Sequence, residues 1–172
     1  MKFLILEVQI KKQQNINSHD KFFKKSMSNP KVAREFFEFH LPKDVAKKVN
    51  LSSLKLEKGS FLDNTLGEGI VDMLFSVDYD ESRGYFYTLV EHQSKADYWM
   101  AFRMSKYILR ICDNHLKKYP KSKHLPLVYP MVFYPGKKEY KSPVDLWCLY
   151  KDPELAKSFF TVYFPEIWLF FL

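Results

Sequence analysis

The chain is poor in the residues that several common protein classes require. Glycine supplies 5 of the 172 residues, which argues against a glycine-rich phosphate loop, a flexible linker or a collagen-like repeat. The two cysteines, Cys112 and Cys148, form no CxxC pair, so we expect neither a disulfide framework nor a cysteine zinc site. This cysteine content is typical of a reducing, cytoplasmic compartment.

Long hydrophobic runs are missing as well. The apolar start, residues 1–8, is interrupted by Gln9, Lys11 and Lys12 before it reaches the length of a signal-peptide core. The last apolar run, residues 167–172, is far shorter than the roughly 20 residues that cross a bilayer. We therefore expect no signal peptide, anchor or membrane partner. An apolar terminus favours self-association as a homo-oligomer unless it docks on the core.

The composition is that of one folded domain with an uneven distribution of charge. Apolar residues make up 47% and charged residues 27% of the chain. Residues 1–60 carry 13 basic and 6 acidic side chains, residues 61–100 carry 2 and 8, and residues 101–172 carry 12 and 6. An acidic centre between basic flanks suits an enzyme that binds DNA through Lys and Arg and holds Mg²⁺ through carboxylates. An unevenly charged, solvated surface explains the pattern about equally well.

Hydrophobic spacing predicts an α/β chain. Helices are expected from about Asp20 and over 31–40, 97–119 and 152–160, with Ser18, His19 or Asp20 capping the first and Asp152 the last. Strands are expected near 54–61 and over 70–79, 85–93 and 127–134, the middle two forming a β-hairpin about a turn at 80–84. Pro130 places the last strand at an edge or a bulge. On the long helix, Phe102, Ile108, Leu109, Cys112 and Leu116 are the expected core-facing stripe.

Asp72 interrupts an otherwise apolar stretch in one strand of the predicted hairpin. Period-two alternation places it on the same face as Leu74, while Glu91 and Gln93 share a face of the partner strand. If the strands pair about the centre of the 80–84 turn, Asp72 lies opposite Glu91. Two carboxylates and an amide would then converge and could bind a divalent cation through oxygen. An acidic strand edge is the more common meaning of this spacing taken alone.

Further motifs surround these acids in a fixed order. They are the run EHQSKADYWMAFRMSKY at 91–107, His19-Asp20 with Phe23-Lys24, residues 33–39 followed by Leu41-Pro42, Ser60-Phe61 with Asp63, and residues 127–134 before Pro135-Gly136. Together they resemble the Rpn family of recombination-promoting nucleases, YhgA-like transposases of the PD-(D/E)xK type. The resemblance spans residues 18–163. It leaves 1–17 as an N-terminal extension and 164–172 as an apolar tail, which we interpret as the end of a truncated reading frame.

The resemblance implies a restriction-endonuclease-like core, with a central mixed β-sheet and flanking helices, and Mg²⁺-dependent endonucleolytic cleavage of DNA in recombination. It also implies that Asp72 and Glu91 are catalytic acids that hold the Mg²⁺. Gln93 stands where many PD-(D/E)xK enzymes have lysine, so it would orient the attacking water or the phosphate without supplying charge. Lys95 is a candidate for the missing charge, although an exposed, solvated lysine is the more common case. Since no base-reading motif is present, we expect low sequence specificity.

Several other residues have weaker claims to a role. Arg103, Lys106 and Arg110 recur at three- and four-residue steps and could follow a phosphate backbone, though a solvated helix face explains them nearly as well. A third acid could come from Glu35, Glu38, Asp63 or Glu68, each more simply read as a surface charge. His92 falls on the opposite face from Glu91 and is interpreted as a packing residue, and His19-Asp20 as a capping pair.

Three functions from different classes remain open at this point. The first is a Mg²⁺-dependent DNA endonuclease centred on Asp72, Glu91 and Gln93. The second is a nucleic-acid-binding remnant of such a nuclease, catalytically silent because part of the chain is missing. The third, an interaction domain without a DNA role, requires the charge segregation to be accidental. Cutting requires the acidic centre, whereas binding requires only the basic flanks, and this difference separates the first two.

Overall fold

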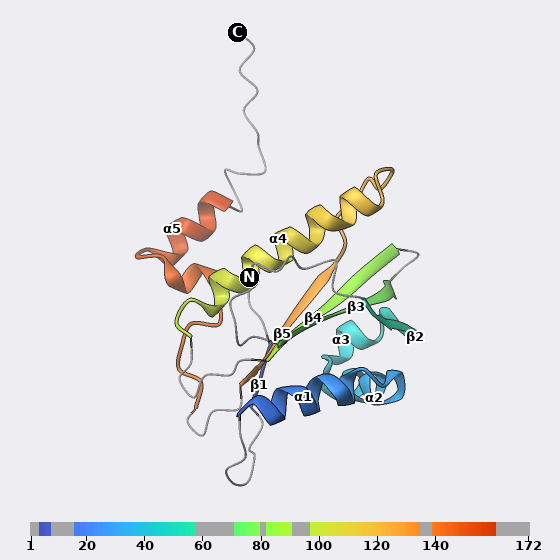
Figure 1. Ribbon diagram of the computed structural model, residues 1–172. Helices are drawn as coiled ribbons and strands as arrows, with labels where there is room; N and C mark the ends of the chain where they lie inside the picture. The colour runs from blue at the N-terminus through green and yellow to red at the C-terminus, as the bar shows by residue number, and fades with distance from the viewer. Residues whose placement is uncertain are drawn as a thin grey trace.

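A five-stranded mixed sheet forms the centre of the protein, in the order β1-β5-β4-β3-β2 (Figure 1). The structure is a computed structural model and describes residues 4–7, 16–57, 71–79, 82–90, 97–134 and 139–160. The strands are β1 (Leu4–Glu7), β2 (Val49–Leu56), β3 (Val71–Tyr79), β4 (Ser82–Val90) and β5 (Val128–Tyr134). β5 pairs in parallel with β1 and β4, while β3 pairs antiparallel with β4 and β2.

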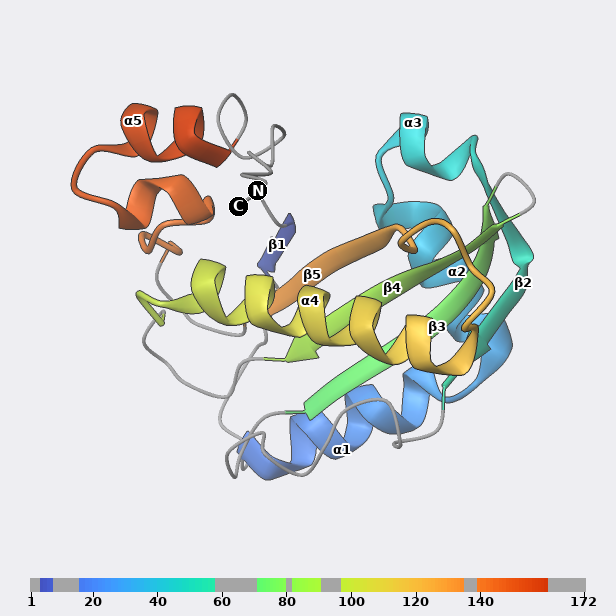
Figure 2. The ribbon, with the colours of Figure 1, turned by 90° about the horizontal axis from the view of Figure 1, so that it is seen from above.

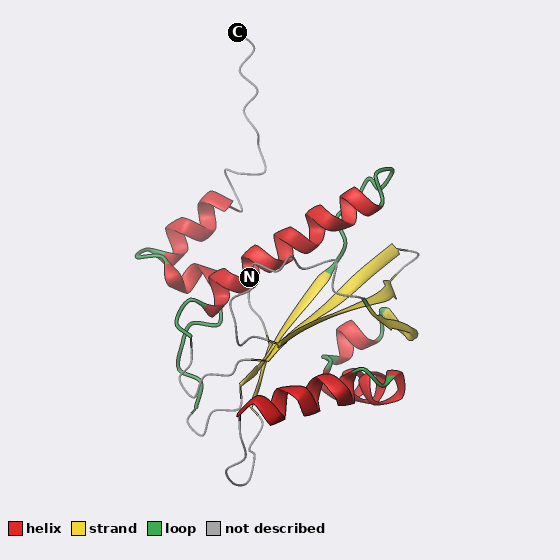
Figure 3. Ribbon diagram, viewed as in Figure 1, coloured by secondary structure: helices red, strands yellow, loops and turns green. Residues whose placement is uncertain are grey.

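Helices cover both faces of this sheet (Figure 3). One face carries α1 (Ile16–Met27), α2 (Pro30–His40) and α3 (Lys43–Ala46), and the other carries α4 (Met100–Lys118), which contacts the 3₁₀ helix η2 (Leu146–Leu149) next to α5 (Pro153–Ser158). The predicted α/β class, with a central mixed sheet and flanking helices, is confirmed, and the arrangement agrees with a restriction-endonuclease-like core. No helix in the described ranges has the length and apolar character that crossing a bilayer requires.

The side chains of β3 alternate between two hydrophobic cores, one on each face of the sheet. Met73 and Phe75 are buried on the α2 side, where the ring of Phe37 lies with its centroid 5.2 Å from that of Phe75. Leu74 points the other way and packs with Tyr85 under α4. The alternation predicted for this strand is therefore confirmed along its buried part.

The β3–β4 hairpin is confirmed, but the predicted pairing is wrong by two residues. Asp72 is paired with Leu89 instead of Glu91, because β4 already begins at Ser82, inside the predicted turn. Asp80, Ser82 and Gly84 all favour turns, so composition alone did not reveal where the strand resumes. A two-residue slip changes the partner of each residue but not the face on which it lies. The predicted alternation of β3 therefore holds, although the predicted facing pair does not, and the faces predicted for Glu91 and Gln93 lie outside the described residues.

A cross-strand ion pair supports the observed register. Asp78 lies directly opposite Arg83, and the Arg83 Nη1 atom is 3.2 Å from the Asp78 Oδ1 atom. Opposite charges in directly facing positions stabilise an antiparallel pair by roughly 0.2–1 kcal/mol, and a slip of the strands would separate them. Arg83 was assigned to the turn from the sequence, so this contact was not anticipated.

α4 confirms the predicted long helix but turns a different side toward the sheet. Of the predicted stripe, Cys112 is buried, whereas Phe102, Leu109 and Leu116 are exposed. The side chains that pack on the sheet are instead Met100, Ala101, Met104, Tyr107 and Ile111. Unbranched methionine adapts to irregular gaps, so it fills this interface better than its modest hydrophobicity suggests. Figure 2 shows the resulting path of α4 across β5, β4 and β3.

Two shorter helices begin at capping residues, of which Asp152 was predicted and Asn29 was not. The Asn29 Oδ1 atom accepts the Lys31 N–H at 3.0 Å at the start of α2, and the Asp152 Oδ1 atom accepts the Leu155 N–H at 2.9 Å at the start of α5. α1 differs, because it begins at Ile16. Ser18, His19 and Asp20, predicted as its N-cap, therefore lie inside the helix. No glycine or proline precedes them to stop the helix there.

The outer strands explain the position of Pro130. β1 pairs with β5 from Met131 onward, and in the described part of the chain no strand pairs with Pro130 on that side. The missing N–H group of proline is tolerated there. β5 as a whole lies between β1 and β4, so the prediction of an edge holds at Pro130 but not for the strand. β1 itself comes from residues 1–17, the segment set apart above as an extension. β2 begins at Val49, earlier than the strand expected near Leu54 and Leu56.

Replacement of Phe37 by alanine should lower the free energy of unfolding by about 3–5 kcal/mol, because it empties a fully buried site between α2 and the sheet. Phe39→Ala on the same helix is the matched control, since that ring is 83% exposed, and it should change stability by no more than about 0.5 kcal/mol. Urea unfolding of both variants measures the difference. Equal losses would contradict the assignment of this core.

Candidate active site at the open end of the hairpin

The end of the β3–β4 hairpin away from its turn, where β3 begins and β4 ends, is the open end of the hairpin. The structure places Asp72 there, as the second residue of β3. Glu91 follows the last residue of β4 in the sequence, and Glu91, Gln93 and Lys95 lie outside the described residues. The backbone of Asp72 is thus located, while the predicted meeting of its side chain with Glu91 and Gln93 stays a prediction.

Three parallel strands, β1, β5 and β4, have their carboxyl ends on the side of the sheet where this open end lies. Val90, the last residue of β4, pairs with Phe133, and the next residue of β5, Tyr134, pairs with Glu7 at the end of β1. Val71 at the start of β3 lies opposite Val90. In α/β sheets, ligands bind outside the carboxyl ends of the parallel strands. The position of Asp72 is therefore one that suits a catalytic residue.

Asp97 anchors the chain where it returns from this edge into α4. Its Oδ1 atom accepts the Trp99 N–H at 2.8 Å, and its Oδ2 atom lies 2.7 Å from the Arg103 Nη1 atom. The Asp97 carbonyl also accepts the Tyr140 hydroxyl at 3.2 Å. Sequence reasoning missed this anchor. Its signal was an aspartate two residues before Trp99, the residue that precedes α4, which is the spacing of an Asx turn.

The contact with Asp97 gives a structural role to Arg103, one of the predicted DNA-binding residues. Burial of its guanidinium lowers the pKa of Arg103, but hydrogen bonds with Asp97 and Tyr107 outweigh that effect, so the pKa is raised overall. Arg103 thus stays charged and is already paired. Lys106 is exposed, with its Nζ atom 5.6 Å from the centroid of the Phe102 ring, and Arg110 is half-buried on the same side of α4.

The other candidates from the sequence are scattered. Glu35 and Glu38 are exposed on α2, across the sheet from α4, so neither lies on the α4 face of β3. Asp63, Glu68 and His92 lie outside the described residues. Within the described ranges, no three His, Cys, Asp or Glu side chains gather into a group that could hold a metal ion.

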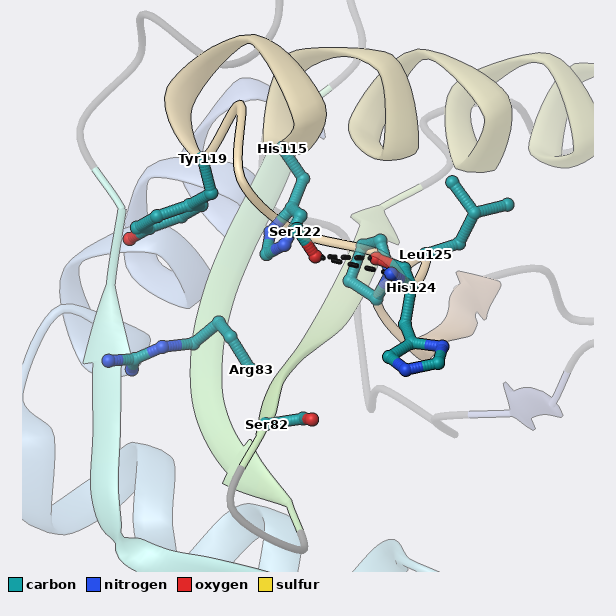
Figure 4. A pocket seen from close by; sticks show the side chains of 8 residues that line it. Ser82, Arg83, His115, Tyr119, Ser122, His124 and Leu125 are labelled. Carbon is teal, nitrogen blue, oxygen red and sulfur yellow. Dashed lines mark hydrogen bonds between the residues drawn. The ribbon is translucent and has the colours of Figure 1, made fainter.

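A polar cavity of about 310 Å³ lies at the opposite end of β4. Figure 4 shows the ring of His115 pointing into it from α4, above Ser82 and Arg83. His115 is 5% exposed, and its Nδ1 atom is 3.0 Å from the Tyr85 hydroxyl. Ser82 and Val90 are about 26 Å apart along an extended strand, at roughly 3.3 Å per residue. The cavity is therefore separate from the open end of the hairpin.

Comparison with known proteins identifies relatives over most of the chain. The family model described as "Putative transposase, YhgA-like" matches residues 17–168. The recombination-promoting nuclease RpnD of Escherichia coli O157:H7 is 41% identical over 87% of this chain and 57% of its own length. RpnA of E. coli K12 is 39% identical over 91% of this chain and 53% of its own length.

A third relative differs from these two in its described activity. It is the "Inactive recombination-promoting nuclease-like protein RpnE" of E. coli K12, 38% identical over 83% of this chain and 48% of its own length. The chain thus spans about half the length of these curated relatives. No solved structure gives a significant match.

The buried His115 should make stability depend on pH. Burial, together with nearby Lys118 and Arg83, lowers the pKa of His115 below its ordinary value of 6.5. As the pH falls through 6.5, the unfolded chain therefore takes up a proton at this residue before the folded chain does. The free energy of unfolding should decrease with acidification from there down to the folded-state pKa.

Melting temperatures at pH 7.5 and 5.5 measure this dependence. His115→Asn keeps a partner for the Tyr85 hydroxyl and should show a smaller loss on acidification than the wild type. His124→Asn, at an exposed histidine of the same cavity, should keep the wild-type loss. His40, whose pKa burial also lowers, is present in every variant and retains part of the effect. An unchanged slope in His115→Asn would contradict the assignment.

Proposed function

This chain belongs to the family described as "Putative transposase, YhgA-like", and we propose that it carries the catalytic core of a Mg²⁺-dependent DNA endonuclease of low sequence specificity that acts in recombination. The observation that carries the proposal is the position of Asp72. This acid lies among the apolar residues Val71, Met73 and Leu74 at the start of β3, at the edge where three strands present their carboxyl ends. Relatives that match most of the chain are named recombination-promoting nucleases, which supports the same chemistry.

The residues around this edge suit a hard cation. Asp72 and Glu91 offer carboxylate oxygens, the ligands that Mg²⁺ prefers, and the chain carries Glu91 directly after the end of β4. When bound, Mg²⁺ supplies positive charge to the phosphate and lowers the pKa of a water molecule. Gln93 would then orient the attacking water or the phosphate through its amide. The apolar neighbours in the strand would limit access of bulk water to the site.

The basic residues of the chain are proposed to hold the DNA backbone. Lys106 is exposed and Arg110 half-buried on α4, and Lys95 lies between Gln93 and the start of that helix in the sequence. Arg103 is paired with Asp97, so we expect it to contribute less to phosphate binding than Lys106. Contacts of this kind follow the phosphates and not the bases, in keeping with low sequence specificity.

A catalytically silent DNA-binding protein is the second candidate. One relative whose name describes it as inactive is 38% identical to this chain, over 83% of this chain. A similar sequence is therefore found in a protein described as lacking nuclease activity. In that case the basic surface would still bind DNA while the phosphodiester bond stays intact. Cutting and binding must therefore be measured on the same preparation.

Asp72→Asn should reduce nicking of supercoiled plasmid in Mg²⁺ by about 100-fold or more, because a metal that has lost a ligand gives up several kcal/mol of transition-state stabilisation. Asp78→Asn is the matched control, since Asp78 lies on the same strand but pairs with Arg83 near the turn. It should cut like the wild type. Both variants should bind plasmid as the wild type does in a gel-shift assay with EDTA.

The same experiment separates the two candidate functions. Wild-type cutting that EDTA and Asp72→Asn both abolish supports the endonuclease. A folded wild-type chain that binds plasmid but leaves it intact with Mg²⁺ contradicts the endonuclease and supports the silent binding protein. Equal cutting by the Asp72 and Asp78 variants would move the catalytic site away from the open end of the hairpin.

Substitutions at Gln93 test its proposed role. Gln93→Ala removes a hydrogen bond to a charged group and should lower the cutting rate about tenfold. Gln93→Lys restores the residue that many enzymes of this type carry at that position, and it should cut at least as fast as the wild type. Initial rates of plasmid nicking at saturating Mg²⁺ provide the comparison. A Gln93→Ala variant with wild-type rates would exclude the residue from catalysis.

A further inference from the structure

Three large aromatic side chains are exposed at the N-terminal end of α4. Tyr98 is 51%, Trp99 56% and Phe102 49% exposed, and none of them belongs to the core under the helix. Tyr98 and Trp99 contact each other edge to face, with their ring centroids 5.3 Å apart. Exposed apolar surface gathered in one place usually marks an interaction site. We refer to Tyr98, Trp99 and Phe102 as the aromatic platform.

The aromatic platform has a fixed backbone. The Trp99 N–H is held by Asp97 Oδ1 at 2.8 Å, and the Trp99 carbonyl accepts the Arg103 N–H at 3.0 Å in the first turn of α4. Met100, the residue after Trp99, is completely buried and attaches this turn to the sheet. A rigid platform loses little conformational entropy when a ligand binds, which favours binding.

Among the described residues, cations border the aromatic platform, and Asp97 and Asp113 are both paired. Lys106 Nζ lies 5.6 Å from the centroid of the Phe102 ring. Farther along α4, Arg110 adds a second positive charge, while Asp113 is paired with Lys117 at 2.8 Å. Asp97 is paired with Arg103. The charge beside the rings is therefore suited to an anionic partner.

Aromatic rings with adjacent cations are the combination that binds single-stranded nucleic acid, where bases stack on the rings and phosphates meet the cations. A regular duplex hides its base faces, so the aromatic platform could contribute little to binding it. We propose that the aromatic platform binds unpaired bases, and that this nuclease acts on DNA containing a single-stranded segment. This substrate class rests on the proposed function, because it names the DNA that the same enzyme would engage.

The test compares two DNA probes and two protein variants. Fluorescence anisotropy with EDTA measures the Kd for a labelled single-stranded oligonucleotide and for the duplex of the same sequence. The double variant Trp99→Ala/Phe102→Ala should weaken single-strand binding at least about tenfold, since each stacked base contributes about 1–3 kcal/mol. Duplex binding should change less than about twofold. Phe39→Ala removes an even more exposed ring from α2 and should leave both affinities unchanged.

Each outcome decides the question. If the double variant and the wild type bind the single strand equally, the proposal is wrong, whatever the plasmid assay shows. A second outcome is a wild type that leaves plasmid intact while the double variant still loses affinity for the single strand. That result would support the aromatic platform and contradict the endonuclease. Sedimentation velocity tests whether the aromatic platform instead binds a second copy of the chain. A dimer that the double variant dissociates, with unchanged DNA binding, would assign this face to a second copy of the chain and overturn the proposal.

Discussion

The antiparallel pairing of β3 with β4 is the constraint on which the rest of the structure depends. It joins the strand that carries Asp72 to the strand that leads toward Glu91, and it determines which side chains of both strands face α4. Because both faces of β3 are buried along its middle, a one-residue slip would exchange two complete hydrophobic surfaces. The cost of that exchange fixes the strand, and with it the position of the candidate catalytic acid at the open end of the hairpin.

The sequence predicted those features that local chemistry decides. The predicted cap at Asp152 locates α5, and strict alternation assigns the faces of β3. Local chemistry did not decide the pairing partner of Asp72, because residues 80–84 offer several equivalent turns. It also misplaced the buried side of α4, where the shape of the sheet selects methionine over Leu109. These misses share a cause, since each depends on contacts between distant segments.

The candidate site is predictable to a different degree. Asp72 stands out in the sequence as an acid in an apolar stretch, and the structure places it at the edge where a ligand site is expected. Asp97 does not stand out, because its role depends on Arg103 and Tyr140, and Tyr140 is far from it in the sequence. The cations of α4 were visible as a row, yet only geometry distinguishes paired Arg103 from exposed Lys106.

The central claim is that Asp72 and Glu91 hold a metal ion at the open end of the hairpin. Anomalous diffraction from crystals of the chain grown with Mn²⁺ and a short DNA tests this most directly, because Mn²⁺ binds the oxygen ligands that Mg²⁺ prefers. The account predicts an anomalous peak in contact with both carboxylates. A peak held by other residues, or no peak at this edge of the sheet, would contradict it.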